Sequence, residues 1–331
     1  MDKQLTFADI ENSSRRRTTR REAFLREMDE TVPWAELVAL VEPFYHDGRR
    51  GRPPVGCERM LRMYFLQIWF NLSDEGVEDA CYDSRAFSDF LGVSFDGRDQ
   101  VPDATTLLRF RRIVEDNGLG RAMLDEVNRV LEAKGVVMRG GSIVDATFID
   151  APSSTKNAAG GRDPEAHQGR KGNEWHFGFK AHVGVDAGSG LVHTVVLTQA
   201  NGSEVANAHA LLRPDDSFCY ADAGYTGVER RPEVAGDPAL AGVEWRVAMR
   251  PGKARALPGP SAERAIERRK ASARAKVEHV FLVAKRQFGW AKTRYRGIKK
   301  NLNRACATFA LVNLALWARA GRPELPERLP A

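Results

Sequence analysis

Hydrophobic positions in the first 135 residues recur with a helical period. The segment ERMLRMYFLQIWFNL is apolar on almost every side, which predicts a buried central helix. Ser73 and Asp74 can cap the segment that runs to Leu91, and Asp103 can cap the segment after Pro102. We therefore predict a compact bundle of short helices. Its members cover residues 34–44, 58–72, 74–91, 103–118 and 119–135.

The pattern changes at residue 136. GSIVDATFID (141–150) is rich in β-branched and aromatic residues and follows two glycines, so it predicts a strand. Two apolar segments, 179–186 and 191–198, are separated by AGSG, which predicts a hairpin. This order of elements indicates a mixed sheet flanked by helices, an α/β fold. The elements expected after the hairpin are a helix at 203–212, strands at 217–224 and 244–252, and helices at about 261–287 and 305–320.

The sequence divides into four parts on this interpretation. Residues 1–30 form an arginine-rich arm, either flexible or folded as a short helix, 31–135 an all-α N-terminal domain, 136–320 the α/β domain, and 321–331 a tail. A bundle of short helices can present one helix to the major groove of DNA or serve as an oligomerisation module. GRRGRPP (48–54) fits either a minor-groove hook or a loop that leads into the next helix.

Composition narrows the class of protein. The 331 residues are 43% hydrophobic and 28% charged, as in an ordinary globular protein. No uncharged apolar run reaches about 18 residues, and the N-terminus lacks the pattern of a secretion signal, so we expect a cytoplasmic protein without a membrane partner. The four cysteines are far apart and show no zinc or disulfide spacing.

Positive charge is concentrated in one segment. Residues 253–304 contain 16 Lys or Arg against 3 acidic residues, while the whole chain carries a formal charge of +6. The rest of the chain is therefore net negative. Such a concentration is typical of a phosphate-binding surface, although a solvated basic helix would produce it too.

Three acidic residues stand where packing does not favour them. Asp145 interrupts the apolar run SIVDATFI, Asp222 ends FCYAD before a glycine turn, and Glu278 lies within the most basic helix. Each alone has an ordinary explanation: a paired strand aspartate, a turn residue, or a salt-bridge partner. At 100° per residue, Arg274, Glu278 and Lys285 project within about 40° of one another, beside an apolar stripe.

Three carboxylates among cations suit phosphoryl transfer. Hard oxygen ligands select Mg²⁺, with Mn²⁺ as a substitute. Two such ions, held by Asp145, Asp222 and Glu278, would stabilise the attacking and leaving oxygens of an in-line displacement.

The motifs VDATFIDAP around Asp145, ADAGYTG around Asp222 and RAKVEHVF around Glu278 resemble those of DDE transposases, specifically the family that includes insertion sequence five. Arg274, Glu278 and Lys285 match its Arg-x3-Glu-x6-Lys spacing, and the resemblance extends from about residue 30 to residue 320. One departure is Ala271, where related transposases carry a tyrosine. The role of that tyrosine is therefore not carried over.

The resemblance implies a ribonuclease H-like catalytic domain in which the three carboxylates bind two metal ions. It implies binding to terminal inverted repeats, cleavage at the element ends and strand transfer into target DNA by a homo-oligomer on double-stranded DNA. Arg274 and Lys285 would contact DNA. We also expect DNA contacts from Lys180 and His182, in a hairpin segment that resembles the family's, and from Arg294 and Arg296 in the basic loop.

Other interpretations stay open at this point. A ribonuclease H-like nuclease without strand transfer shares the carboxylates, and a catalytically silent DNA-binding derivative shares the basic surface. A mononuclear metallohydrolase using histidines fits the spacing poorly; its candidates are His176, His182, His193 and His209. Trp245 can stack on a flipped base or belong to the core.

Overall fold

The structure is a computed structural model that describes residues 17–45, 54–94, 99–136, 140–158, 160–259 and 261–321. Most of the predicted basic arm, most of GRRGRPP and all but the first residue of the predicted tail lie outside the described residues. None of the helices that the structure describes is long and apolar enough to cross a membrane.

The N-terminal helices form where the hydrophobic period predicted them, with two differences. Ser73 accepts a hydrogen bond from the Gly76 amide and Asp103 accepts one from the Thr106 amide, so both predicted N-caps are confirmed. The segment 74–91 is not one helix, because the chain becomes extended at Ser84. The described part of the arm contains a short helix, one of its two expected forms, but this helix is part of the core because its Leu25 and Met28 are buried. The elements are α2 (Arg20–Thr31), α3 (Trp34–Val41), η1 (Glu42–Phe44), α4 (Cys57–Trp69), α5 (Asp74–Asp83), α6 (Arg85–Leu91), α7 (Ala104–Asp116) and α8 (Leu119–Ala133).

A mixed sheet follows. The strands are β1 (Ser142–Asp150), β2 (His167–Lys171), β3 (Glu174–Asp186), β4 (Val192–Gln199), β5 (Phe218–Ala221) and β6 (Glu244–Val247). Their order is β2-β3-β1-β5-β6, with β4 also paired to β3. β1 is antiparallel to β3 and parallel to β5, and β5 is parallel to β6. The predicted hairpin is confirmed, but the structure adds β2, which pairs with an N-terminal extension of β3 that the sequence analysis missed.

The remaining helices and turns connect β4, β5 and β6 or follow the last strand. They are α9 (Glu204–Asn207), η2 (His209–Leu211), η3 (Ala223–Tyr225), η4 (Val228–Arg230), α10 (Pro232–Ala235), α11 (Pro251–Ala256), α12 (Ala262–Leu282), its π-helical continuation η5 (Val283–Gln287) and α13 (Ile298–Arg319). The predicted helix at 261–287 is confirmed as α12 with η5. The last helix begins earlier than expected, at Ile298, and it is buried on nearly every side instead of being amphipathic.

Helices cover both faces of the sheet. On one face, α12 and α13 contribute Val277, Val280 and Phe309 to a core that also contains Ile143 of β1 and Val183 of β3. On the other face, the short helices after β4 and β5 pack against residues of β1 and β5 in a smaller core. Because successive strand residues point to opposite faces, odd-numbered residues of β1 and β3 face α12.

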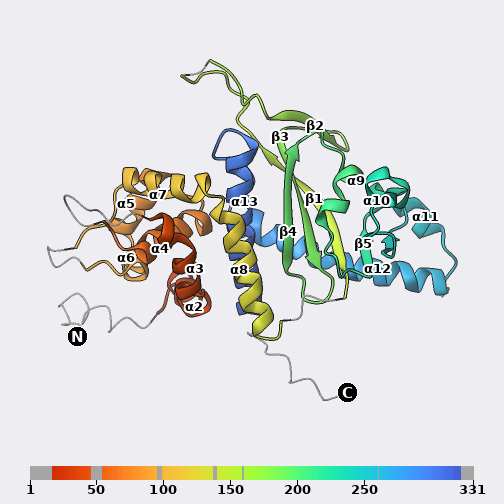
Figure 1. The fold of residues 1–331 in the computed structure, drawn as a ribbon, viewed down its shortest axis with the longest axis horizontal. Coiled ribbons are helices and arrows are strands. Elements are labelled where there is room, and N and C mark those ends of the chain that lie inside the picture. The colour runs from red at the N-terminus through yellow and green to blue at the C-terminus, as the bar shows by residue number, and fades with distance from the viewer. Residues whose placement is uncertain are drawn as a thin grey trace.

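The N-terminal helices and the sheet share one core. Figure 1 shows α8 and α13 side by side between the N-terminal helices and the sheet. Apolar residues of α4, α8, α13 and β4 belong to a single buried cluster. The boundary expected at residue 136 falls between α8 and β1, but no break in packing accompanies it.

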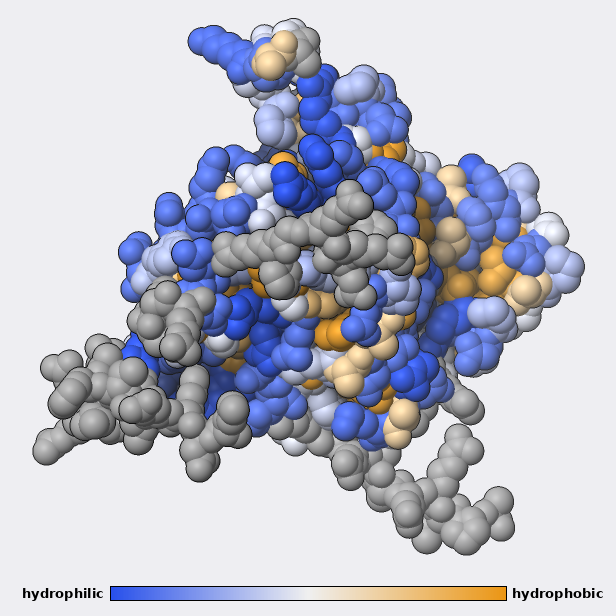
Figure 2. All heavy atoms as spheres, turned by 60° about the vertical axis from the view of Figure 1, so that its left-hand side comes forward, coloured by the Kyte–Doolittle hydropathy of each residue, from blue (hydrophilic) through white to orange (hydrophobic). Residues whose placement is uncertain are grey.

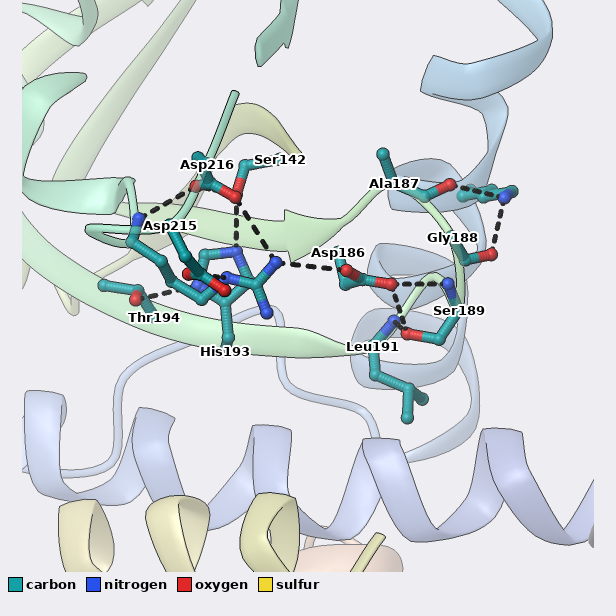
Figure 3. A network of polar contacts seen from close by, with 12 residues as sticks. Ser142, Asp186, Ala187, Gly188, Ser189, Leu191, His193, Thr194, Asp215 and Asp216 are labelled. Atoms are coloured by element: carbon teal, nitrogen blue, oxygen red, sulfur yellow. Dashed lines mark hydrogen bonds and ion pairs between the residues drawn. The ribbon is translucent and has the colours of Figure 1, made fainter. Parts of the chain in front are cut away.

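A buried polar network fixes the end of the sheet where β1 and β5 begin (Figure 3). Arg213 lies 3.2 Å from the Asp186 carboxylate and 3.3 Å from that of Asp216, both of which have fully buried side chains. Ser142 donates to Asp216 and lies 2.9 Å from Nε2 of His193. Burial, followed by Arg213, lowers the pKa of His193 to about 3, so the ring is neutral. Ser142 is fully buried, so this group has no access to a substrate.

Candidate active site

Asp145 and Asp222 lie on neighbouring parallel strands. The register of β1 and β5 pairs Ile143 with Tyr220, and two further steps along each strand bring Asp145 beside Asp222. Neighbouring strands are separated by about 4.8 Å. The sheet therefore brings together two of the three predicted carboxylates, although 77 residues separate them in the sequence.

Local backbone geometry orients both side chains. Asp222 directly follows β5 in an extended conformation, and its Oδ1 accepts a 2.8 Å hydrogen bond from the Gly224 amide as the N-cap of η3. A side chain at Gly224 would press against that carboxylate. The Oδ1 atom of Asp145 accepts a 2.7 Å hydrogen bond from the Ala146 amide. Each carboxylate keeps one oxygen free of these local bonds.

The electrostatic environment of Asp145 is unfavourable for a bare carboxylate. Burial, with smaller contributions from the charges of Asp222 and Glu204, raises its pKa to about 6, while the Ala146 amide and Arg274 act in the opposite direction. The repulsion between Asp145 and Asp222 is what a bound cation would relieve.

Helix α12 supplies the third predicted carboxylate. Arg274 is half-buried, favours the charged form of Asp145, and has a buried Nε without a hydrogen-bond partner among the described residues. Glu278 follows one helical turn later and is exposed. Lys285 is half-buried in η5, where its Nζ donates a 2.8 Å hydrogen bond to the Phe148 carbonyl of β1.

Lysines attach α12 to the sheet on both sides of Glu278. Lys276 Nζ donates to the carbonyls of Ala187 and Gly188 in the turn after β3, the latter at 2.7 Å. Together with the bond from Lys285 to β1, these contacts fix where the helix lies along the strands. The backbone at Glu278 is therefore held between two anchored points.

The residues present fit a divalent metal in their chemistry. Asp145 and Asp222 offer the hard oxygen donors that Mg²⁺ prefers, in a setting where their charges are not fully compensated. Within the part of the chain that the structure describes, no three His, Cys, Asp or Glu side chains form a group that could hold a metal ion. Glu278 is thus not gathered with the two aspartates.

Lys180 and His182 lie inside the protein, contrary to the expectation that they contact DNA. Lys180 is only 8% exposed, pairs with Glu204 at 3.0 Å and donates to the Gly202 carbonyl. His182 is fully buried beside Thr198 Oγ1 at 2.9 Å. Burial, followed by the charge of Lys180, lowers the pKa of His182 to about 4, so it is neutral near pH 7. The sequence did not reveal this, because alternation alone does not say which face of a strand is covered.

Arg294 and Arg296 link separate parts of the chain. Arg294 Nε donates a 3.0 Å hydrogen bond to the side chain of Asn71, just after α4. Arg296 donates to the carbonyls of Gly161 and Arg162, at 3.1 and 2.6 Å. Both arginines remain exposed. Their exposure is compatible with the predicted contacts to DNA. Both side chains also hold the loop that contains them against other parts of the chain.

Two residues near the aspartates were not predicted from the sequence. Glu204 contributes a negative charge close to Asp145 and is held by Lys180. Tyr225 is fully buried, its hydroxyl has no hydrogen-bond partner among the described residues, and burial followed by Glu204 and Asp145 raises its pKa. Tyr225 stands in the ADAGYTG motif, which was a usable signal. Glu204 follows the N-cap Ser203 and therefore indicated only a helix start.

The four candidate histidines, all within the described residues, do not form a metal site of their own. His176 Nδ1 lies 2.9 Å from Asp150, and His209 Nδ1 lies 2.9 Å from the Ala206 carbonyl. His182 and His193 are buried with hydroxyl partners. Trp245 is partly buried against the smaller core, as expected for a core tryptophan.

Comparison with protein families gives two matches. The family model described as a transposase DDE domain matches residues 138–314, and a transposase domain of the DUF772 family matches residues 12–112. The first match contains all three predicted carboxylates and covers more than half of the chain. No solved structure matches the chain.

Proposed function

The chain belongs to the family of transposases with a DDE domain, and on that basis we propose that it mobilises an insertion sequence of the insertion sequence five family. It would bind the terminal inverted repeats, cleave the DNA at the element ends and transfer the strands into target DNA. We further propose that residues 136–320 form a ribonuclease H-like catalytic domain, and that the protein acts as a homo-oligomer on DNA in the cytoplasm.

One observation carries the proposal: the strand register puts Asp145 beside Asp222 under a basic helix that bears Glu278. The strand order β3-β1-β5-β6, with β3 antiparallel to its neighbour, supports a ribonuclease H-like topology. We propose that Asp145, Asp222 and Glu278 hold two Mg²⁺ ions, for which Mn²⁺ can substitute. When bound, the ions would activate the attacking oxygen and stabilise the leaving oxygen.

The protein residues supply position and charge in this scheme. Asp222, fixed by the Gly224 amide, and Asp145, fixed within β1, offer rigid donors from adjacent strands. Glu278 would reach the site from the facing helix by a change of side-chain conformation, since its backbone is held by the anchored lysines.

Arg274 is suited to hold the phosphodiester. Its Nε is buried and has no hydrogen-bond partner in the described parts of the chain, so a phosphate oxygen would satisfy it beside the two aspartates. Lys285 lies on the same side of the helix, and we propose that its ammonium group contacts the DNA backbone next to its bond with Phe148.

The test is metal-dependent cleavage of a duplex that carries an element end, obtained by finding matching inverted repeats on either side of the gene. We expect nicking with Mg²⁺ or Mn²⁺ and a loss greater than about 100-fold in Asp222→Ala, since removing one electrostatic stabiliser of a transition state already costs about that much. Glu278→Gln should lose cleavage but keep DNA binding. Glu263→Gln, the same change at an exposed position of α12, is the matched control.

A second measurement separates a transposase from a nuclease. A precleaved end with a free 3′-hydroxyl is supplied together with target DNA, and joined product is expected. Cleavage without any joining would contradict strand transfer, and normal cleavage by Glu278→Gln would remove that residue from the site.

A further inference from the structure

The β2–β3 hairpin carries the most exposed large hydrophobic side chain that the structure describes. Trp175 is 65% exposed, whereas the other exposed hydrophobic side chains range from 39% to 52%. Hydrophilic residues cover most of the surface visible in Figure 2. A single exposed hydrophobic residue is common, so its exposure alone carries no conclusion. What distinguishes Trp175 from other exposed hydrophobic residues is its position in the hairpin.

One face of the hairpin combines aromatic rings with positive charge. Trp175 pairs with Arg170 across the hairpin, and Phe177 pairs with Gln168 on the same face. The guanidinium of Arg170 lies 5.7 Å from the Trp175 ring, and that of Arg162 lies 5.4 Å from the Phe177 ring. We call the face made by Gln168, Arg170, Trp175 and Phe177 the tryptophan face.

No acidic residue belongs to the tryptophan face. Glu174 points to the opposite face, where Lys171 is its cross-strand partner. The charges of that pair offset each other. The tryptophan face is therefore left with Arg170 and the neighbouring Arg162 as its charged groups.

The tryptophan face lies on the same side of the sheet as Asp145, beyond the residues of β3 that the core covers. Asp145 pairs with Val183, and odd-numbered residues of β3 from Trp175 to Val183 share that face. Eight residues at about 3.3 Å each separate Trp175 from Val183, about 26 Å in all. Phosphates of one strand of B-DNA recur every 3.4 Å along the axis, so this span corresponds to about eight base pairs.

The hairpin is held firmly at its base. His176 Nδ1 lies 2.9 Å from the Asp150 carboxylate, and its ring stacks on Phe148 at 4.5 Å. The Ala151 amide donates a 2.7 Å hydrogen bond to the Phe177 carbonyl. Trp175 is therefore presented near the beginning of a supported strand, β3, which Figure 1 shows beside β2.

We propose that the tryptophan face contacts duplex DNA about eight base pairs from the cleavage point, with Trp175 packed in the minor groove and Arg170 on a phosphate. A groove offers apolar sugar and base edges flanked by phosphates, which matches a ring flanked by guanidinium groups. The inference rests on the proposed function, which places cleavage at Asp145 and Asp222.

The test uses the full-length protein with Asp222→Ala, so that DNA is bound without being cut, and an element-end duplex of about 30 base pairs. All six tryptophans lie in described parts of the chain, and Trp175 is the exposed one while the others are buried or half-buried. Quenching of tryptophan fluorescence by acrylamide should therefore fall when DNA binds. That fall should be absent when Trp175→Phe is added.

Affinity provides the second measurement. Trp175→Ala should weaken binding about 5- to 100-fold, the range seen when one aromatic contact to nucleic acid is removed, while Trp175→Phe should keep most of it. Ile266→Ala, at another exposed apolar side chain, is the control and should stay within about 2-fold of the parent.

The outcomes separate this inference from the proposed function. Cleavage and joining by a protein whose Trp175 stays accessible on DNA, or unchanged affinity in Trp175→Ala, would overturn the inference alone. Protection of Trp175 on DNA by a wild-type protein that never cuts would overturn the proposed function alone. Protection that grows with protein concentration in the absence of DNA would indicate a second copy of the chain and would also overturn the inference.

Discussion

Replacing Asp145 by asparagine should stabilise the metal-free protein at neutral pH, although it should abolish cleavage. The substitution keeps the shape of the side chain and removes the charge. Burial, together with Asp222 and Glu204, disfavours that charge in the folded state and raises the pKa of Asp145 to about 6. The Ala146 amide, which bonds to Oδ1, can still bond to the amide oxygen of asparagine.

The magnitude follows from the shift in pKa. The value rises from 3.8 to about 6, and one unit corresponds to about 1.4 kcal/mol, so the ionised carboxylate costs up to about 3 kcal/mol of folding free energy. The folded state binds this proton more tightly than the unfolded state. The cost is therefore absent below about pH 4, grows between pH 4 and 6, and is constant above that range.

Urea unfolding of the wild type and Asp145→Asn at several pH values tests this reasoning. The difference in free energy of unfolding should be small near pH 4 and should favour the variant by about 2–3 kcal/mol at pH 7. Saturating Mg²⁺ should reduce or reverse the difference, because the ion stabilises only the charged site, by about 2.7 kcal/mol at 100 times its dissociation constant. A pH-independent difference, or equal stabilisation of both proteins by Mg²⁺, would refute it.

Three further predictions concern other parts of the structure. Arg213→Met leaves two buried carboxylates without their cation and should lower the free energy of unfolding by about 3–5 kcal/mol in urea titrations; a loss below about 1 kcal/mol would contradict the network. Tyr225→Phe removes a buried hydroxyl for which the described residues offer no partner and should leave the thermal midpoint unchanged or higher, whereas a marked fall would show that the hydroxyl is bonded. Lys299→Gln, at an exposed position, should reduce the salt dependence of DNA binding by about one unit of slope, and Lys276→Gln should not; equal effects of the two changes would count against this distinction.

The sequence predicted the elements around Asp145 and Asp222 well, because each carried a local signal. The β-branched run after Gly141 marked β1, and the Asp-Ala-Gly turn marked the end of β5. The two aspartates could therefore be predicted as candidate metal ligands from the sequence. Their closeness depends on the parallel register of β1 and β5, which arises from packing over a long separation.

The missed strand β2 shows where local pattern stops being informative. Its sequence HQGRK is polar and contains a glycine, so it lacks strand propensity. It pairs with β3 because Gly169 fits closely against the Ala200 carbonyl and the Phe148 ring, where a side chain would collide. These contacts join residues that are distant in the sequence, so the local residue pattern does not indicate them.

The burial of His182 illustrates the same limit within a correctly predicted strand. Its alternating pattern allowed either face to be covered. The even-numbered face of β3 is covered by the connections after β4, where Lys180 meets Glu204 and His182 meets Thr198. The amino-acid sequence alone did not show which segments would pack over this face.

The 16 cations of residues 253–304 can serve two purposes, binding of DNA phosphates and attachment of helices to the rest of the protein. Their number alone does not distinguish the two. Several of these side chains donate to backbone carbonyls of the sheet and the neighbouring helices, as Lys270, Lys276, Lys285 and Arg304 do. Counterion release depends on cations that approach phosphate, so anchored cations contribute less to salt-dependent binding than their number suggests. The three lysines still act on the site, because they hold α12, and with it Arg274 and Glu278, over the strands that carry the aspartates. A basic run on a catalytic helix can therefore serve the geometry of the carboxylates as much as the attraction of DNA.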